Sequence, residues 1–254
     1  MSALFALGAI ALIVGTMVGA TGIGGFLIIP AMVWLIDMPV RTAMGTALLA
    51  SAANGLLATV LFRRKGHLDW SIAGPLAAGS ALFALAGAGL NRWLPLQAVV
   101  AALGAVMVIG SALTLTRDIA TARPLLQGSR LVATSSLGVI GALSGMAAGL
   151  TGAGGPLICV PLMALLAYPV LATVGASQVL QVVASTMGAV PFWQAGQWST
   201  DALLLIVPVQ LIGIRAGAHL AHVVDARVAS RCVSGLGILA GLGILAVAIW
   251  RPPA

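Results

Sequence analysis

The chain is a succession of long apolar runs separated by short polar turns. An α-helix needs about 20 apolar residues to cross a hydrocarbon core of roughly 30 Å, and each run is of about this length or longer. We therefore predict an all-α polytopic membrane protein. The runs cover residues 2–36, 42–62, 70–90, 95–116, 131–167, 171–193, 201–222 and 229–250.

The order of apolar and polar positions repeats after 130 residues. The heptapeptide GATGIGG at 19–25 returns as GLTGAGG at 149–155. Other residues stay in the same register, as Leu27 with Leu157, Pro39 with Pro169 and Gly45 with Gly175. We therefore predict two pseudo-symmetric repeats of about four hydrophobic segments each. Their expected bounds are 1–116 and 131–254, with a polar linker at 117–130 that holds a proline and a glycine.

The first segment of each repeat is about 35 residues long, more than one ordinary crossing requires. The glycine motif interrupts each of these segments near its middle, which predicts a broken helix or a re-entrant hairpin. If each segment enters and leaves by one face, slightly more of the loop Arg and Lys residues fall on the cytoplasmic side. The preferred arrangement is therefore re-entrant, and the two repeats are then inverted relative to each other.

Composition and charge narrow the function classes. The chain is 61% hydrophobic and 7% charged, with a mean hydropathy of +1.14, whereas soluble domains carry about 25% charged residues. The net charge of +7 comes from residues in short loops and not from one basic face, so we expect a lipid bilayer and no nucleic acid as partner. Cys159 and Cys232 have no spaced partner ligands, and no metal or cofactor is expected.

A glycine-rich break at membrane depth needs a physical reason. Backbone groups released from a helix must be buried in protein or line a polar cavity, and a helix that restarts there offers unpaired N–H groups and partial positive charge. Two such starts form an anion site in outline. The alternative is that the glycines only allow close helix packing. The candidate binding residues of the two motifs are Thr21, Gly22, Gly24, Gly25, Thr151, Gly152, Gly154 and Gly155.

The helix after each motif adds polar side chains at helical spacing. Residues three or four positions apart share one face of a helix, and further candidates on these faces are Ser51, Asn54, Ser177, Gln178 and Gln181. Ser51 and Gln181 are equivalent at the offset of 130 residues, so they are the preferred side-chain contacts. Hydrogen bonding between helices is the alternative role of such residues.

Arg215 is the clearest ionisable residue inside a predicted segment, and His219 follows one turn later. An intramembrane charge is a functional candidate by default, so Arg215 is a candidate to attract an anion and His219 a candidate for proton coupling. Both residues lie toward the end of their segment, where a long side chain reaches the interface. An interface role is the favoured alternative.

The residues GATGIGGFLIIP, PVRTAMGTALLAS and GHLDW, with the second copies GLTGAGGPLICVP and GASQVLQ, resemble the TauE/SafE family of sulfite exporters. The resemblance covers nearly the whole chain. It implies a permease of the bacterial inner membrane that exports a small sulfur-containing or organic anion, such as sulfite, sulfoacetate or thiosulfate. The second copy departs from strict equivalence because Pro156 follows its glycines where the first copy has Phe26.

The mechanism expected for such a protein is alternating access around an anion held between the two glycine motifs. A membrane potential that is negative inside favours anion exit by about 2.3 kcal/mol per charge per 100 mV, so export needs no obligatory coupling ion. A passive anion channel is the nearest alternative. An intramembrane serine protease built on Ser144 is a weaker one, because no histidine lies in a recognisable motif and the doubled glycine motif has no purpose in that chemistry. No enzymatic activity is therefore expected.

Overall fold

The computed structural model describes residues 2–115, 130–153, 155–166, 168, 170–220 and 226–250. Within these ranges every element of regular secondary structure is a helix, which confirms the all-α prediction. Seven of the helices are long and apolar enough to cross a membrane. The predicted linker lies almost entirely in 116–129, outside the described residues. Gly154 is also outside the described residues.

The first half of the chain contains α1 (Ser2–Thr21), the short 3-10 helix η1 (Gly25–Leu27), α2 (Ile28–Ile36), α3 (Val40–Arg64), α4 (Trp70–Trp93) and α5 (Leu96–Leu115). The second half contains α6 (Arg130–Thr151), α7 (Pro156–Leu165), α8 (Val170–Gln194), α9 (Thr200–Leu220) and α10 (Ala226–Trp250). Both glycine motifs lie where one helix ends and the next begins. The helices that flank each motif, α1 with α2 and α6 with α7, are in contact.

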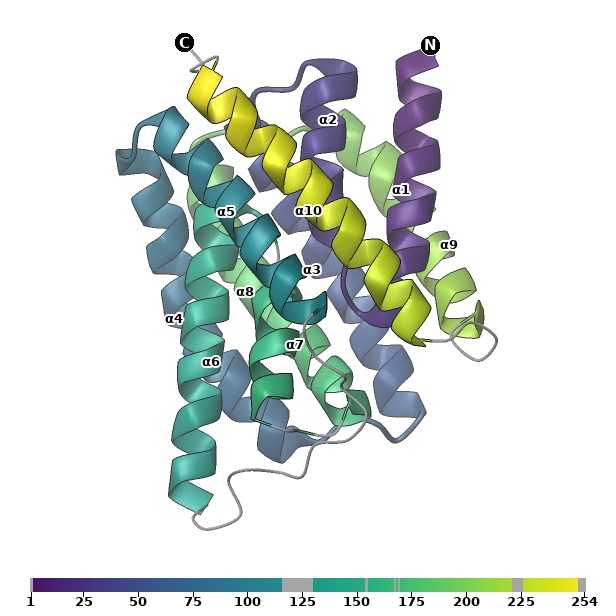
Figure 1. Cartoon of the computed structure of the whole chain (residues 1–254), viewed down its shortest axis with the longest axis vertical. Coiled ribbons are helices and arrows are strands. Elements are labelled where there is room, and N and C mark those ends of the chain that lie inside the picture. The colour runs from purple at the N-terminus through teal and green to yellow at the C-terminus, as the bar shows by residue number, and fades with distance from the viewer. Residues whose placement is uncertain are drawn as a thin grey trace.

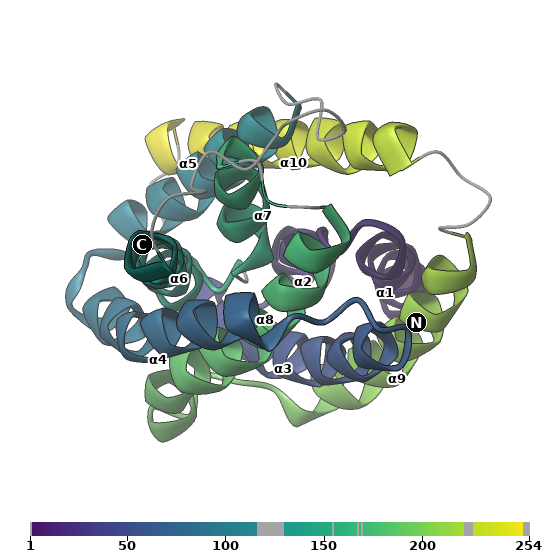
Figure 2. The same cartoon turned by 90° about the horizontal axis from the view of Figure 1, so that it is seen from below.

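Each glycine motif is the tip of a helical hairpin. Figure 1 shows α1 running down from the N-terminus and α2 turning back up, whereas α6 rises from below and α7 returns downward. The two hairpins thus approach the middle of the protein from opposite ends. Figure 2 shows the same bundle from below. This is the arrangement that the re-entrant, inverted alternative requires; the depth of each tip in a bilayer stays a prediction.

Helices of the first half contact helices of the second half in pairs, and the contacts of each pair are related by the offset of 130 residues. Gly15 of α1 packs against the backbone of Gln210 in α9, and Gly145 of α6 packs against the backbone of Ser80 in α4. Both members of the second pair lie 130 positions from their counterparts in the first pair. The same relation holds for Gly19 with Ile214 and Gly149 with Ala84, and for Gly45 with Gln197 and Gly175 with His67. Reciprocal contacts of this kind are what a two-fold relation between equal units produces.

These contacts explain the many glycines of the chain. A side chain at Gly149 would collide with the backbone of Ala84 and Ala88, so only glycine allows α6 to lie this close to α4. Small residues at helix contacts are typical of membrane proteins, because helix association there depends on close packing. The first helix of each half is therefore fixed to a helix of the other half, α1 to α9 and α6 to α4.

The outer surface carries large apolar side chains. Trp93, Leu131, Phe5 and Leu82 are each at least 74% exposed. Soluble proteins seldom expose so many large apolar groups together, and a lipid environment accounts for them. The surface therefore agrees with the membrane-spanning lengths of the helices.

Candidate functional site

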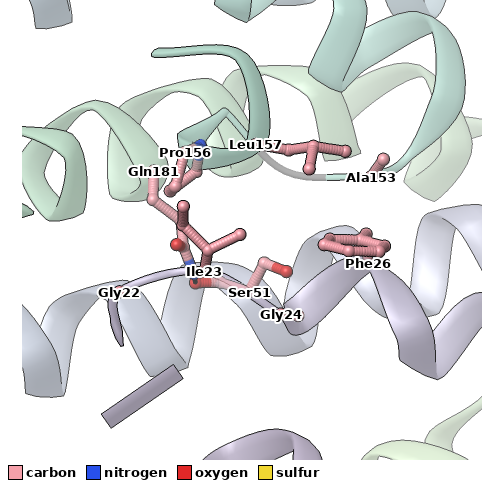
Figure 3. A pocket seen from close by; sticks show the side chains of 10 residues that line it. Gly22, Ile23, Gly24, Phe26, Ser51, Ala153, Pro156, Leu157 and Gln181 are labelled. Carbon is pink, nitrogen blue, oxygen red and sulfur yellow. Dashed lines mark hydrogen bonds between the residues drawn. The ribbon is translucent and has the colours of Figure 1, made fainter. Parts of the chain in front are cut away.

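A small cavity lies where the two glycine tips meet, and we call it the tip cavity (Figure 3). The first tip, the second tip and the two following long helices all contribute to its walls. Its volume is ≈ 10 Å³, about the space that one water molecule needs. It is lined by Gly22, Ile23, Gly24, Gly25, Phe26, Ser51, Ala153, Pro156, Leu157 and Gln181.

The first tip is shaped by Thr21 and two glycines. Gly22 has φ +76° and Gly24 has φ +135°, backbone conformations that favour glycine. The N–H of Gly22 donates to Val18 O at 2.8 Å and closes the last turn of α1. The Thr21 hydroxyl donates to Met17 O at 2.9 Å and accepts from Ile23 N–H at 3.2 Å. Thr21 therefore holds the end of the helix in place and leaves the glycines to face the cavity.

The second tip repeats this geometry. The Thr151 hydroxyl donates to Ala147 O at 2.7 Å and accepts from Ala153 N–H at 3.3 Å. Gly152 has φ +71°, and its N–H donates to Ala148 O at 2.8 Å. The predicted threonines thus act on the backbone of the tips, and of the predicted glycines of this motif Gly152 and Gly155 are described.

The two helix starts offer different numbers of backbone donors. At the first tip, the hydrogen bonds of the described residues give no backbone acceptor to the N–H groups of Gly25 and Phe26. At the second tip α7 begins with Pro156, which has no N–H. The departure from strict repetition noted in the sequence therefore removes, at Pro156, the backbone donor that the first tip has at Phe26.

Ser51 and Gln181 meet in the cavity. Gln181 Nε2 donates to Ser51 O at 2.9 Å, and both side chains are 4% exposed. A Cβ on Gly25 would lie 3.8 Å from Ser51 Oγ, so this hydroxyl faces the first tip. The structure thus brings together the two side chains that the repeat register singles out.

The other polar candidates lie behind the cavity wall. Gln178 Nε2 donates to Gly22 O at 3.3 Å and so supports the first tip from outside. Ser177 Oγ donates to Val174 O of its own helix at 2.8 Å. Asn54 Nδ2 donates to Gln210 Oε1 at 2.8 Å and links α3 to α9. For Ser177 and Asn54 the observed contacts are those of the alternative role, hydrogen bonding within and between helices.

Arg215 does not line the tip cavity. Its side chain is exposed on α9, as is that of His219 one turn later. The interface role that sequence reasoning favoured for both residues stays a prediction. Among the described residues, every buried polar side chain is uncharged, so the interior around the tips is electrically neutral apart from its backbone dipoles.

Sequence reasoning missed two residues that anchor the second tip. Asn91 is fully buried at the end of α4, and its Nδ2 donates to Leu150 O at 2.6 Å, in the last turn before that tip. Arg41 Nη2 donates to Asn91 O at 3.1 Å and to Leu94 O at 2.7 Å. An asparagine at the end of an apolar run was the only signal, and it does not reveal which carbonyl the side chain reaches.

Comparison with known proteins agrees with the membrane fold. Over 87 residues the chain is 38% identical to a "Probable membrane transporter protein" of Xylella fastidiosa (strain 9a5c), a match that covers 34% of this chain and 32% of the relative. Over 102 residues it is 30% identical to the "Probable membrane transporter protein YunE" of Bacillus subtilis (strain 168), covering 40% and 37%. The chain thus matches about a third of the length of these relatives. No solved structure matches it.

The sequence model of one protein family covers nearly the whole chain. It is described as "Sulfite exporter TauE/SafE" and matches residues 7–244, which include both glycine tips and every residue that lines the cavity. Together with the helices long enough to span a membrane, this match shows a multi-pass membrane protein that belongs to the TauE/SafE family.

Proposed function

We propose that this protein exports sulfite, or a related small sulfur-containing or organic anion, across the inner membrane of a bacterium. The observation that carries the proposal is the tip cavity, where two broken helices and the side chains of Ser51 and Gln181 converge. Broken helices that meet between repeats are where transporters bind their substrates. The family description supports sulfite as the first substrate to test.

Binding of the anion rests on hydrogen-bond donors. The N–H groups of Gly25 and Phe26 begin a helix at the cavity wall, where the partial positive charge of the helix start favours an anion. The hydroxyl of Ser51 adds a donor from α3. These groups replace part of the water shell that the anion loses on entry.

Transport proceeds by alternating access. A cavity of ≈ 10 Å³ is too small for a sulfur oxyanion, which is several times larger than one water molecule. The tips must therefore separate toward one face to admit the anion and toward the other face to release it. A central cavity this small favours a carrier over a channel with a continuous open path.

The moving parts are expected to combine helices of both halves. Glycine contacts between backbones fix α1 to α9 and α6 to α4, and close-packed interfaces without flexible side chains resist sliding. Each hairpin then moves with its partner helix. The units 1–116 and 131–254 are equivalent in sequence, but on this proposal they do not move as two separate bodies.

Counterflow in proteoliposomes tests the proposal. Vesicles with the purified protein are loaded with unlabelled sulfite, and uptake of labelled sulfite is followed against empty vesicles. Saturable uptake that requires internal sulfite supports a carrier for this anion. Conductive flux without counterflow would support a channel, and the absence of any flux with a panel of sulfur and carboxylate anions would refute the proposed substrate class.

A further inference from the structure

The walls of the tip cavity carry no charged side chain. Its lining consists of glycine, alanine, proline, large apolar residues, one serine and one glutamine. The polar contribution comes from Ser51, Gln181 and backbone N–H groups. An anion that enters this cavity therefore meets dipoles and no cation.

Among the described residues, the helices that pack around the cavity bring no titratable group to it. Helices α1, α2 and α8 contain no titratable side chain, and α7 contains only Cys159, whose Sγ lies 3.7 Å from Met163 Sδ and which does not line the cavity. On α3, Arg41 is bound to the end of α4. The remaining charged or titratable side chains that are described on the neighbouring helices α3, α4, α9 and α10 are exposed: Arg63, Arg64, Arg92, Asp201, Arg215, His219, Arg231 and Cys232.

The charge of the substrate follows from this neutral lining. The free energy of removing an ion from water grows with the square of its charge, and a buried charge needs a partner charge or strong hydrogen bonds. Helix starts and neutral donors stabilise anions at such a site, but a second charge raises the cost of leaving water steeply, and the lining holds no cation to offset it. We infer that the tip cavity prefers a singly charged oxyanion to doubly charged ones; this inference rests on the proposed function.

One acceptor in the cavity indicates the protonated form of the anion. Gln181 donates Nε2 to Ser51 O at 2.9 Å, and none of the hydrogen bonds of the described residues involves its Oε1. This oxygen repels a bare oxyanion but accepts the O–H of a protonated one. The side chains of Phe26 and Leu157 on the other walls offer no hydrogen bond to a further oxygen. Hydrogen sulfite, with one charge and one O–H, fits this mixture of donors and acceptor, whereas thiosulfate and sulfoacetate carry two charges.

The proton then crosses the membrane on the substrate. Hydrogen sulfite forms from sulfite and a proton on one side and releases that proton on the other side, so charge and protons balance without a carboxylate relay in the protein. The exported species carries one negative charge and moves with the membrane potential. Coupling to a proton therefore needs no titratable residue in the tip cavity.

Exchange of three anions at several pH values tests the inference. Proteoliposomes with the full chain are loaded in turn with sulfite, with methanesulfonate, which stays singly charged, and with sulfate, which stays doubly charged. We expect sulfite exchange to fall about tenfold per pH unit once the pH exceeds the second pKa of sulfurous acid, in step with the singly charged fraction. Methanesulfonate exchange should stay constant with pH, and sulfate should exchange much more slowly than methanesulfonate.

The Gln181→Leu variant separates the roles of charge and proton. Because methanesulfonate has no O–H, this substitution should reduce sulfite exchange more than methanesulfonate exchange; an equal loss for both would overturn the role given to the glutamine oxygen. Sulfite exchange that rises with pH, or sulfate exchange as fast as that of methanesulfonate, would overturn the charge inference and leave anion transport in place. No exchange of any anion by folded protein would instead refute the proposed function itself.

Discussion

Gln181 donates a hydrogen bond of 2.9 Å to the backbone oxygen of Ser51, the residue that stands 130 positions earlier in the other repeat. Two equivalent residues of a two-fold pair can touch only near the axis that relates them. The contact therefore places the tip cavity close to the pseudo-symmetry axis, where both hairpins end. A site on this axis can open toward either face by equivalent movements of the two halves, as alternating access requires.

Replacement of Gln181 by leucine should impair both transport and stability. The change leaves Ser51 O buried without its partner, which costs about 1–3 kcal/mol, and it removes a polar group from the cavity. We expect sulfite counterflow to fall about tenfold or more, which corresponds to about 1.4 kcal/mol in the barrier. Thermal unfolding in detergent and counterflow would be measured on the same preparation.

The control for this variant is Thr186→Val on the same helix. Thr186 is exposed, and its hydroxyl donates to Val182 O of its own helix at 2.7 Å, so its replacement removes a hydrogen bond away from the cavity. Near-normal transport is expected. Equal transport losses in both variants would show that any change in α8 is harmful, and the special role of Gln181 would be lost.

Gly25→Ala should block transport in a protein that still folds. Its φ is not in the positive region, and an added Cβ would meet only Ser51 Oγ at 3.8 Å and Val18 Cγ2 at 3.9 Å, both ordinary contact distances. Stability should change by about 0.5 kcal/mol or less. The methyl group projects toward a cavity of ≈ 10 Å³, so we expect counterflow to fall about tenfold or more.

Gly74→Ala provides the matched control for the glycine substitution. Nothing lies within 4 Å of an added Cβ at this exposed position of α4. The exchange should stabilise the helix by up to about 1 kcal/mol and leave transport unchanged. Wild-type counterflow in Gly25→Ala would show that the first tip is not part of the binding site.

Much of the fold and part of the site follow from the sequence. Segment lengths and the doubled glycine motif predict the helices and their breaks, and the fixed offset between repeats selects Ser51 and Gln181, which the structure brings into contact. The side-chain partners do not follow in the same way. Asn54 and Gln178 share helical faces with the cavity residues, yet their amides bind Gln210 and the Gly22 carbonyl, since rotation and crossing angle of each helix depend on packing.

The exchanged pairing of helices is also beyond sequence reasoning. Glycines at 15, 19, 145 and 149 indicate that another helix packs closely against them, but any helix with a stripe of small residues could be that helix. Only the structure assigns α1 to α9 and α6 to α4. This assignment changes the expected moving bodies, although the repeat boundaries read from the sequence stay as they are.

Gly149→Ala should destabilise the protein as a whole. An added Cβ would lie 2.8 Å from Ala88 N and 2.9 Å from Ala84 C, and the backbone of α4 cannot move aside as a flexible side chain would. Overpacking of this kind costs about 1–3 kcal/mol. Thermal unfolding should therefore begin several degrees lower than in Gly8→Ala, where an added Cβ meets nothing within 4 Å. Equal stability of the two variants would contradict the close approach of α6 to α4.

Arg215→Gln should leave transport near the wild-type level. The side chain is exposed on α9 and does not line the tip cavity, so its charge is screened by solvent or headgroups and contributes little to an anion at the tips. We expect less than about a twofold change in the Km for sulfite counterflow, a free-energy change below about 0.5 kcal/mol. A large rise in Km that Arg215→Lys restores would instead assign this charge to the anion path, because the lysine keeps the charge and loses only the planar hydrogen-bonding geometry. Either result separates the neutral tip cavity from a site that depends on a cation.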